Sequence, residues 1–254
     1  MNENQFSLQN KNIVITGASS GIGRQCAITC SHLGANIILV ALEDDKLNET
    51  LKLLPQGNNL CYTQDITKYE EIDTIISDAV SKVGKISGFV HSAGIEMTLP
   101  LNMLKPENFS RVYSVNVISA FEFSRRISHK KNINENGASF VFIASIMSDF
   151  GQAGKIGYCS SKGALVSGAR AMALELIAKK IRVNCISPAV VQTEMSKNLL
   201  DSLTPEAQNE ILMMHPMGVG QPQDIANGCA FLMSDASKWI NGINLHIDGG
   251  YGAK

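Results

Sequence analysis

Short apolar and β-branched runs alternate with longer stretches of helical periodicity along this chain of 254 residues. The alternation favours right-handed βαβ units, whose strands form one parallel sheet covered by helices on both faces. We therefore predict a single α/β domain over residues 1–254, built on a doubly wound sheet of about seven strands. The predicted strands are Asn12–Thr16, Asn36–Leu42, Asn59–Gln64, Gly88–His91, Ser139–Ala144, Arg182–Ile186 and Asn244–Ile247, and the predicted helices are Ile22–Leu33, Asp44–Leu54, Tyr69–Val83, Pro106–His129, Tyr158–Lys179 and Gln223–Met233.

A glycine-rich turn follows the first predicted strand, at the edge where sheets of this kind bind ligands. Gly17, Gly21 and Gly23 stand between Thr16 and the first helix. Glycines allow close approach of the backbone, and the helix N-terminus offers free N–H groups to a diphosphate. The spacing differs from Gly-x-Gly-x-x-Gly, and no Gly-Lys-Ser/Thr follows, which argues against a P-loop hydrolase. Taken alone, such a turn is also compatible with a structural role.

This turn resembles that of the classical short-chain dehydrogenase/reductase family, and the resemblance runs from about Phe6 to Gly250. Asp65-Ile66-Thr67 is similar to the family's adenine-contacting segment, and Asp248-Gly249-Gly250 to its C-terminal motif. His91-Ser92-Ala93-Gly94 stands where the family usually has Asn-Asn-Ala-Gly. The resemblance implies a Rossmann-like fold with NAD or NADP bound by Gly17, Ser19, Ser20, Gly21, Ile22, Gly23, Leu42, Asp65, Ile66, Ser92, Ala93, Gly94, Tyr158, Lys162, Pro188, Val191 and Thr193.

Tyr158 and Lys162 are spaced to share one face of a predicted helix. A tyrosine, with a pKa of ~10, is a poor acid or base at neutral pH, and a nearby ammonium should lower that pKa. Ser145 ends a predicted strand and should face the same cleft. The set Ser…Tyr-x-x-x-Lys is similar to the catalytic set of the family.

The resemblance implies a role for each of these residues. Ser145 would hydrogen-bond the substrate oxygen, Tyr158 would exchange the proton, and Lys162 would bind the nicotinamide ribose. Asn116 matches the family's helix asparagine, which anchors a water in the proton relay. The chain is then an oxidoreductase that moves a hydride between NAD(P) and a carbonyl or secondary alcohol. Open alternatives are a 3-oxoacyl-(acyl-carrier-protein) reductase, a sugar- or sterol-type alcohol dehydrogenase, and a non-catalytic dinucleotide-binding protein.

The stretch after Ser187 resembles the family's nicotinamide-contacting segment, which includes Pro188, Val191 and Thr193 here. By the same resemblance, residues at about 192–217 form a mobile substrate lid, although plain helical packing against the core is an alternative. Flexible methionines suit an adaptable apolar wall. The candidate substrate contacts are Met147, Met195, Met213 and Met214.

Composition and spacing argue against several other classes. The formal net charge is -1 and no basic block is present, so nucleic acid is a poor partner. The longest apolar stretch, Ile37–Leu42, is too short to span a membrane. The five histidines lack metal-ligand spacing, and we interpret His32 and His246 as structural. His91 follows the fourth predicted strand, where contact with the cofactor region is an alternative to a structural role. Ser160 and Ser161 lack a Gly-x-Ser-x-Gly elbow. Six scattered cysteines and a polar N-terminal segment indicate free thiols and a cytoplasmic location.

Cofactor preference and assembly are weaker expectations. The second strand leads from Ala41 and Leu42 into Glu43-Asp44-Asp45, whose charges would repel a 2′-phosphate, so NAD is favoured over NADP. An acyl carrier protein would need a basic surface, for which the candidates are Arg125, Arg126, Lys130 and Lys131. The resemblance implies a homotetramer or homodimer that pairs through the helix after Tyr158, whose small residues are Gly163, Ala164, Gly168, Ala169, Ala171 and Ala173.

Overall fold

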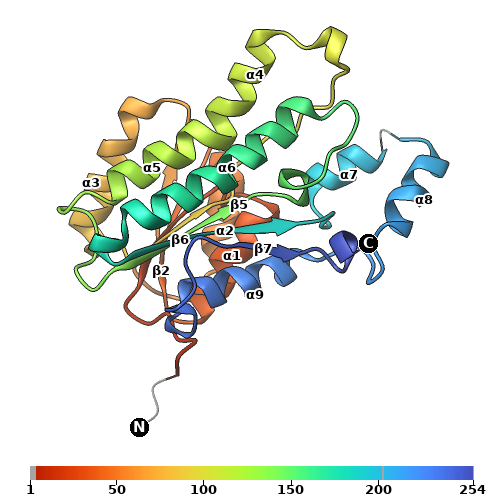
Figure 1. The fold of residues 1–254 in the computed structure, drawn as a ribbon. Coiled ribbons are helices and arrows are strands. Elements are labelled where there is room, and N and C mark those ends of the chain that lie inside the picture. Colours follow the sequence, from red (N-terminus) through yellow and green to blue (C-terminus); the bar gives the residue numbers. More distant parts are fainter. Residues whose placement is uncertain (1–3, 202, 254) are drawn as a thin grey trace.

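The computed structural model describes residues 4–201 and 203–253. Its centre is a sheet of seven strands in the order β3-β2-β1-β4-β5-β6-β7 (Figure 1). Every neighbouring pair is parallel, as the alternation of strands and helices predicts. The strands are β1 (Asn12–Thr16), β2 (Asn36–Ala41), β3 (Leu60–Thr63), β4 (Gly88–His91), β5 (Ala138–Ile143), β6 (Ile181–Pro188) and β7 (Asn244–Ile247).

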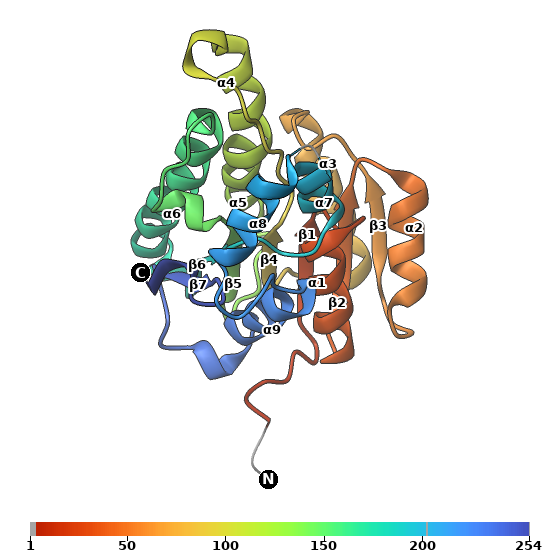
Figure 2. The same cartoon turned by 90° about the vertical axis from the view of Figure 1, so that its right-hand side faces the viewer.

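Helices cover both faces of the sheet (Figures 1 and 2). One face carries α1 (Gly21–His32), α2 (Asp44–Leu53) and α9 (Pro222–Met233). The other face carries α3 (Ile72–Val83), α4 (Pro106–Tyr113), α5 (Ser119–Ile127) and α6 (Ile156–Glu175). Two further helices, α7 (Glu194–Asp201) and α8 (Pro205–Met213), follow β6 beyond the carboxyl edge of the sheet.

The sheet separates two apolar cores. Ile13 and Ile15 of β1 pack into the core beneath α1 and α9, whereas Val14 packs into the core beneath α5 and α6. This division follows from the two-residue period of a strand. Because both faces are buried there, the central strands β1 and β2 are nearly continuous apolar runs.

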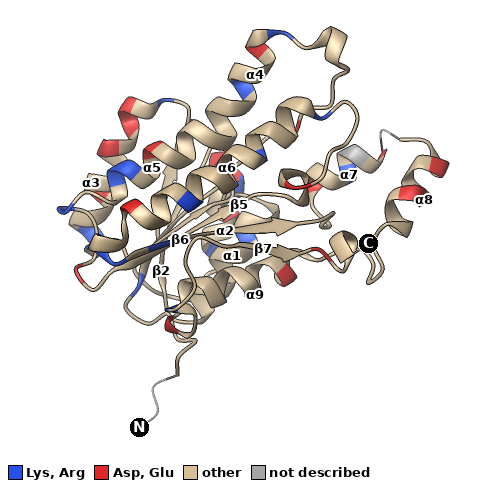
Figure 3. Ribbon diagram, in the orientation of Figure 1, with Lys and Arg blue, Asp and Glu red and all other residues tan. Residues whose placement is uncertain are grey.

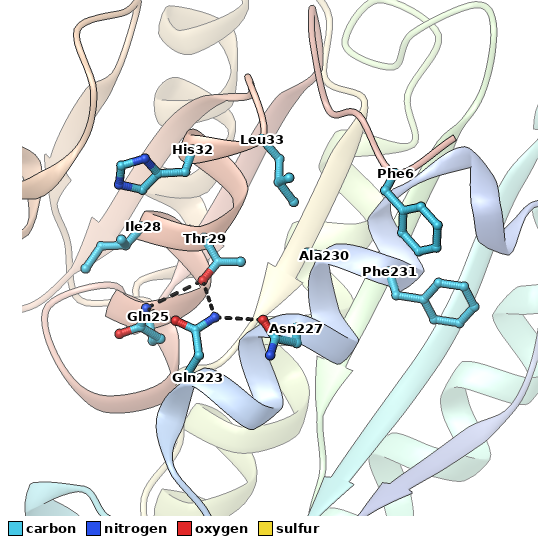
Figure 4. Close-up of a pocket in the computed structure, with 10 residues that line it drawn as sticks. All are labelled: Phe6, Gln25, Ile28, Thr29, His32, Leu33, Gln223, Asn227, Ala230 and Phe231. Atoms are coloured by element: carbon cyan, nitrogen blue, oxygen red, sulfur yellow. Dashed lines mark hydrogen bonds between the residues drawn. The ribbon is translucent and has the colours of Figure 1, made fainter. Parts of the chain in front are cut away.

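The helix pair α1 and α9 is also joined by polar contacts (Figure 4). Gln25 donates to Gln223 over 2.7 Å, and Gln223 donates to Thr29 over 3.0 Å. Beside them lies an open pocket of about 500 Å³, whose walls include Phe6, His32 and Phe231. The pocket borders the C-terminal half of α1, away from the glycine-rich turn that precedes this helix.

The order of the strands creates a crevice at the carboxyl ends of β1 and β4. The chain runs outward from β1 to β2 and β3, and then returns to place β4 on the other side of β1. Thr16, the last residue of β1, is in register with His91, the last residue of β4. A reversal of this kind is where open α/β sheets bind ligands. The loops that follow Thr16 and His91 therefore meet at the expected binding site.

The structure corrects one predicted helix. The predicted span Pro106–His129 is α4 and α5 joined by a π-helical segment, Ser114–Ile118. A π turn inserts one extra residue and rotates the side chains beyond it. The pattern of apolar residues did not reveal this insertion, because the stretch stays helical throughout.

Candidate active site

The glycine-rich turn forms a cradle at the start of α1. Gly17 has a φ of +67°, and a Cβ on it would lie 2.7 Å from the backbone nitrogen of Ala93. A Cβ on Gly23 would lie 2.2 Å from the carbonyl oxygen of Gly17. Ser20 is the N-cap residue but makes no side-chain cap, and the first turn of α1 contains no acidic residue. Free N–H groups and the positive helix end thus suit a diphosphate.

Arg24 braces this turn, a contact that the sequence analysis missed. Its Nη2 donates to the Ser19 carbonyl over 2.5 Å and to the Lys46 carbonyl over 3.1 Å, and its Nε donates to Thr50 Oγ1 over 2.9 Å. The guanidinium therefore ties the glycine-rich turn to α2. No spacing rule marks such an arginine, because its partners are separated from it along the chain.

Three predicted adenine-side residues follow β2 and β3. The Leu42 side chain is 69% exposed just after β2, whereas Ile66 is buried. Asp65 Oδ1 accepts hydrogen bonds from the Thr67 backbone nitrogen over 2.9 Å and from Thr67 Oγ1 over 2.7 Å. These bonds lower the pKa of Asp65 and keep it ionised. They fix the loop after β3 at the same sheet edge as the glycine-rich turn.

Ser145, Tyr158 and Lys162 come together at the carboxyl end of β5. Ser145 is buried there, and its Oγ accepts a hydrogen bond from the Met147 backbone nitrogen over 3.1 Å. Lys162 Nζ donates to the Ile143 carbonyl over 2.8 Å and lies 5.7 Å from the centre of the Tyr158 ring. The predicted one-face spacing on α6 is thus realised, and both side chains face the end of β5.

Asn116 joins this group from the π-helical segment. Its Oδ1 accepts from the Ile95 backbone nitrogen over 2.8 Å, and its Nδ2 donates to the Ile95 carbonyl and to Ser161 Oγ, each over 3.0 Å. A Cβ on Gly94 would lie 3.4 Å from both Asn116 Oδ1 and Lys162 Nζ. Asn116 therefore fastens the loop after β4 beside Lys162.

The ionisation of Tyr158 and Lys162 differs from the sequence-based expectation. Burial raises the pKa of Tyr158 to about 12, and the neighbouring Ser145 hydroxyl only partly opposes this shift. Burial lowers the pKa of Lys162 to about 8. The expectation of a lowered Tyr158 pKa is therefore wrong for this structure, since desolvation disfavours the charged form of each group.

His91 is a buried link between the ends of β4 and β1. Its Nδ1 lies 2.9 Å from Thr16 Oγ1, which also accepts a hydrogen bond from the Ala93 backbone nitrogen over 3.4 Å. Among the described residues, its Nε2 is a buried polar atom without a hydrogen-bond partner. Burial, followed by the Lys162 charge, lowers the pKa of His91 to about 3. The imidazole is thus neutral in the folded chain.

The neutral His91 predicts acid sensitivity. In the unfolded chain, His91 binds a proton below its ordinary pKa of 6.5. In the folded chain, it does so only below a pKa of about 3. The contribution of neutral His91 to the free energy of unfolding is therefore fully present above pH 6.5. It is lost as the pH falls from 6.5 toward 3, by about 1.4 kcal/mol per pH unit. Between pH 7 and 5, the unfolding free energy of the wild type should fall by about 2 kcal/mol more than that of His91→Asn. Urea unfolding measures both, and equal losses would refute the prediction.

The segment after β6 returns to the glycine-rich turn. A Cβ on Gly21 would lie 3.1 Å from Thr193 Cγ2. Val191 forms a parallel bridge with Gly220, and Gln192 donates its backbone N–H to the Gly220 carbonyl over 2.8 Å. The segment between Val191 and Gly220 therefore begins and ends at neighbouring positions. Pro188, Val191 and Thr193 thus lie on a short path along the crevice.

His215, which the sequence analysis left unassigned, fastens this path from the end of α8. Its Nε2 accepts from the Val190 backbone nitrogen over 3.1 Å, and its Nδ1 lies 2.6 Å from the Ile211 carbonyl. Several apolar side chains are exposed nearby in sequence: Met195, Met213 and Met214 are 46%, 74% and 42% exposed. Met147, the fourth candidate substrate contact, is partly buried beside Ser145.

Within residues 4–201 and 203–253, no group of three or more His, Cys, Asp or Glu side chains is placed to hold a metal ion. In the same residues, no helix has the length and apolar character needed to cross a membrane. His246 Nε2 lies 2.8 Å from Asp149 Oδ2. The six cysteines are free thiols.

Comparison with known proteins agrees with this geometry. A family model described as enoyl-(acyl carrier protein) reductase matches residues 17–252. The 7α-hydroxysteroid dehydrogenase of Escherichia coli K12 is 34% identical over 98% of this chain and 97% of its own length. The 3-oxoacyl-[acyl-carrier-protein] reductase of Rickettsia felis is 30% identical over 96% of this chain and 98% of its own.

Solved structures extend the likeness to three dimensions. A 7α-hydroxysteroid dehydrogenase in complex with NADH and 7-oxo glycochenodeoxycholic acid superposes with a TM-score of 0.89 at 32% identity, covering 98% of this chain and 97% of that one. A 2-deoxy-D-gluconate 3-dehydrogenase structure from Agrobacterium tumefaciens with bound NADP gives 0.88 at 26% identity, covering 99% and 100%. The matches span the sheet, the glycine-rich turn and the residues around Tyr158. The chain is an NAD(P)-dependent oxidoreductase that belongs to the classical short-chain dehydrogenase/reductase family.

Proposed function

We propose that Tyr158 is the proton-transfer residue of this oxidoreductase. The observation that carries the proposal is the convergence of Ser145, Tyr158 and Lys162 at the end of β5, with Asn116 adjoining Lys162 through Gly94. In alcohol oxidation Tyr158 accepts the hydroxyl proton while the carbinol carbon loses its hydride. In carbonyl reduction the Tyr158 hydroxyl gives that proton to the oxygen. The nicotinamide, when bound, accepts or supplies the hydride.

The neighbouring residues have separate tasks in this proposal. Ser145 Oγ holds the substrate oxygen, and Lys162 binds the nicotinamide ribose and stabilises the phenolate when the proton leaves. Asn116 anchors a water that connects Lys162 to solvent. The glycine-rich turn, with Ser19, Ser20 and Ile22, holds the diphosphate; Asp65 and Ile66 face the adenine. Ser92 and Ala93, and Pro188, Val191 and Thr193, line the two sides of the crevice.

We further propose that NAD binds better than NADP. Glu43 and Asp44 follow the end of β2, where Asp44 accepts from Thr63 Oγ1 over 2.6 Å. The nearby Lys46 is already paired, with Glu43 over 2.9 Å and with Glu194 over 3.4 Å. Leu42 offers no positive charge to a 2′-phosphate. Calorimetric titration should therefore give NADH an affinity several-fold higher than NADPH. Tighter binding of NADPH would overturn the preference.

Residues 192–217 are proposed as the substrate lid of a single domain that covers the chain. Its exposed apolar side chains, Met213 and Met217 at 74% and 85%, suit a bulky apolar substrate, since large exposed apolar patches usually mark binding surfaces. This favours a sterol-type alcohol, the class named for the Escherichia coli relative. A sugar alcohol fits such a wall less well.

The basic residues considered for an acyl carrier protein are placed elsewhere. Arg125 and Arg126 lie at the C-terminal end of α5, away from α7 and α8 (Figure 3). Arg125 pairs with Glu122 over 2.7 Å, and Arg126 and Lys131 lie within 3.5 Å and 3.7 Å of Asp73. Within one chain these groups do not border Tyr158. A 3-oxoacyl-thioester reductase remains the second candidate, supported by the Rickettsia felis relative.

A substrate panel tests these assignments. Nicotinamide absorbance would be followed with 7-oxo glycochenodeoxycholic acid, an acetoacetyl thioester and a keto sugar, each with NADH and NADPH. We expect the highest kcat/KM for the steroid ketone. A clear preference for the thioester would favour the second candidate, and a preference for the sugar would contradict the proposed apolar lid.

The assembly proposed from the resemblance is a homotetramer or homodimer in the cytoplasm. Two of the six small residues suggested for pairing, Ala169 and Ala173, are buried in the core of their own chain, and Gly168 packs against Phe121. The outer face of α6 still exposes Leu174, at 76%, and Ile177 follows it at 62%. These side chains are the better candidates for contact with a second copy.

A further inference from the structure

A buried ion pair stands at the start of α6, one turn before Tyr158. Lys155 Nζ contacts Glu96 Oε1, and the two side chains are only 8% and 17% exposed. Lys155 is also the N-cap residue of α6, where a positive charge opposes the helix dipole. Buried ion pairs give little net stability, although breaking one by removing a single partner is costly. Stability alone is therefore a poor reason for this pair.

Contacts on both sides of Glu96 hold it in place. The Asn116 side chain forms two hydrogen bonds, of 2.8 Å and 3.0 Å, with the backbone of Ile95, the residue before Glu96. Further along the loop, the Leu99 backbone nitrogen donates to the Gly154 carbonyl over 2.7 Å. A Cβ on Gly157 would lie 2.7 Å from Met97 Cε, so this loop lies directly against the first turn of α6. Glu96 is thus fixed between Asn116 and the turn that carries Tyr158.

Charged side chains from two elements lie around Tyr158. Burial is the main cause of its raised pKa, Ser145 opposes it, and the Glu96 carboxylate and the Cys159 thiol add to it. From α6, Lys162 lies 5.7 Å from the ring centre, and Lys155 holds Glu96. The loop after β4 therefore contributes the negative charge that raises this pKa, and Lys155, at the start of α6, pairs with it.

We propose that the Glu96–Lys155 pair is a positioning element of the reaction, which fixes the turn that carries Tyr158 and keeps a carboxylate beside that turn. This inference rests on the proposed role of Tyr158. A nearby carboxylate favours the protonated phenol, which is the proton donor in carbonyl reduction. In that direction the phenolic proton passes to the carbonyl oxygen while the hydride passes from the nicotinamide to the carbonyl carbon. The carboxylate therefore adds to the burial that keeps the Tyr158 phenol protonated.

Two substitutions should move the pH profile in opposite directions. Glu96→Gln removes the negative charge, so the ionisation seen in alcohol oxidation should shift to lower pH. Lys155→Met leaves Glu96 without its partner, so the same ionisation should shift to higher pH. Each shift should be about half a pH unit or more. The probe is the alcohol whose ketone gives the highest turnover in the substrate panel.

A matched control is available in another ion pair. Glu135→Gln removes a carboxylate that pairs with Lys85 over 2.7 Å at an exposed site, and it should leave the profile unchanged. Glu96→Asp, which keeps the charge, should restore most of the wild-type profile. If Lys155→Met does not fold, as judged by circular dichroism, the pH profiles of Glu96→Gln and Glu96→Asp still test the proposal.

Lost turnover with an unmoved pH profile would mean that the pair is merely structural and would overturn the proposal. Shifts of both variants in the same direction would overturn it as well. A failure of the proposed role of Tyr158 can be distinguished from a failure of this inference. If Tyr158→Phe is inactive but Glu96→Gln leaves the profile unmoved, only this inference fails, whereas an active Tyr158→Phe removes the basis of both.

Discussion

Tyr158→Phe should lower turnover by roughly 10²–10⁴-fold while leaving cofactor affinity nearly unchanged. The substitution removes one oxygen and keeps the ring, so the packing of the ring against the neighbouring loops is preserved. Without the phenol, hydride transfer to a carbonyl carbon leaves an alkoxide that has no donor. Steady-state rates and calorimetric titration with NADH measure the two quantities separately.

Tyr62→Phe is the matched control for this experiment. It makes the same chemical change on β3, where the Tyr62 hydroxyl donates to Asp78 over 2.6 Å. Turnover should stay near that of the wild type. Near-normal turnover of Tyr158→Phe on a good substrate would show that another group moves the proton.

Lys162→Ala should reduce both turnover and cofactor affinity. The ammonium is proposed to bind the nicotinamide ribose and to stabilise the phenolate, so its loss affects binding and proton transfer together. It also leaves the buried Ile143 carbonyl without the donor that lies 2.8 Å away. We expect a loss of about 10²-fold or more in turnover, with a raised Kd for NADH.

Lys82→Ala serves as a control for this variant, since Lys82 forms an exposed pair with Asp78 over 2.7 Å. An unchanged Kd in Lys162→Ala, with turnover alone reduced, would contradict the proposed ribose contact. Wild-type turnover would contradict both roles.

The sheet was largely predictable from sequence, because strands buried on both faces are continuous apolar runs. The bounds of β1, β4 and β7 agree with the predicted ones. Parallel strands bring their carboxyl ends to one edge, so the meeting of Gly17 with Ala93 also follows from the topology. The shared helix face of Tyr158 and Lys162 was predictable because residues four apart in a helix lie on one side of it.

Features that depend on contacts between distant segments were not predictable. Arg24, His215 and the Glu96–Lys155 pair have partners supplied by other parts of the chain. The π-helical turn at Asn116 has the same apolar pattern as an ordinary helix. The ionisation of Tyr158 was misjudged because spacing reveals a neighbouring charge but not the loss of water around it.

The paired ends of the segment between Val191 and Gly220 have an evolutionary consequence. Because these residues are bridged, the length of chain between them does not affect the distance that it must span. The entropic cost of closing such a loop rises only slowly with its length. Insertions, deletions and whole exchanges can therefore accumulate there while the sheet and the glycine-rich turn stay intact. Relatives of one architecture can in this way diverge in the molecules they accept without rebuilding the rest of the protein.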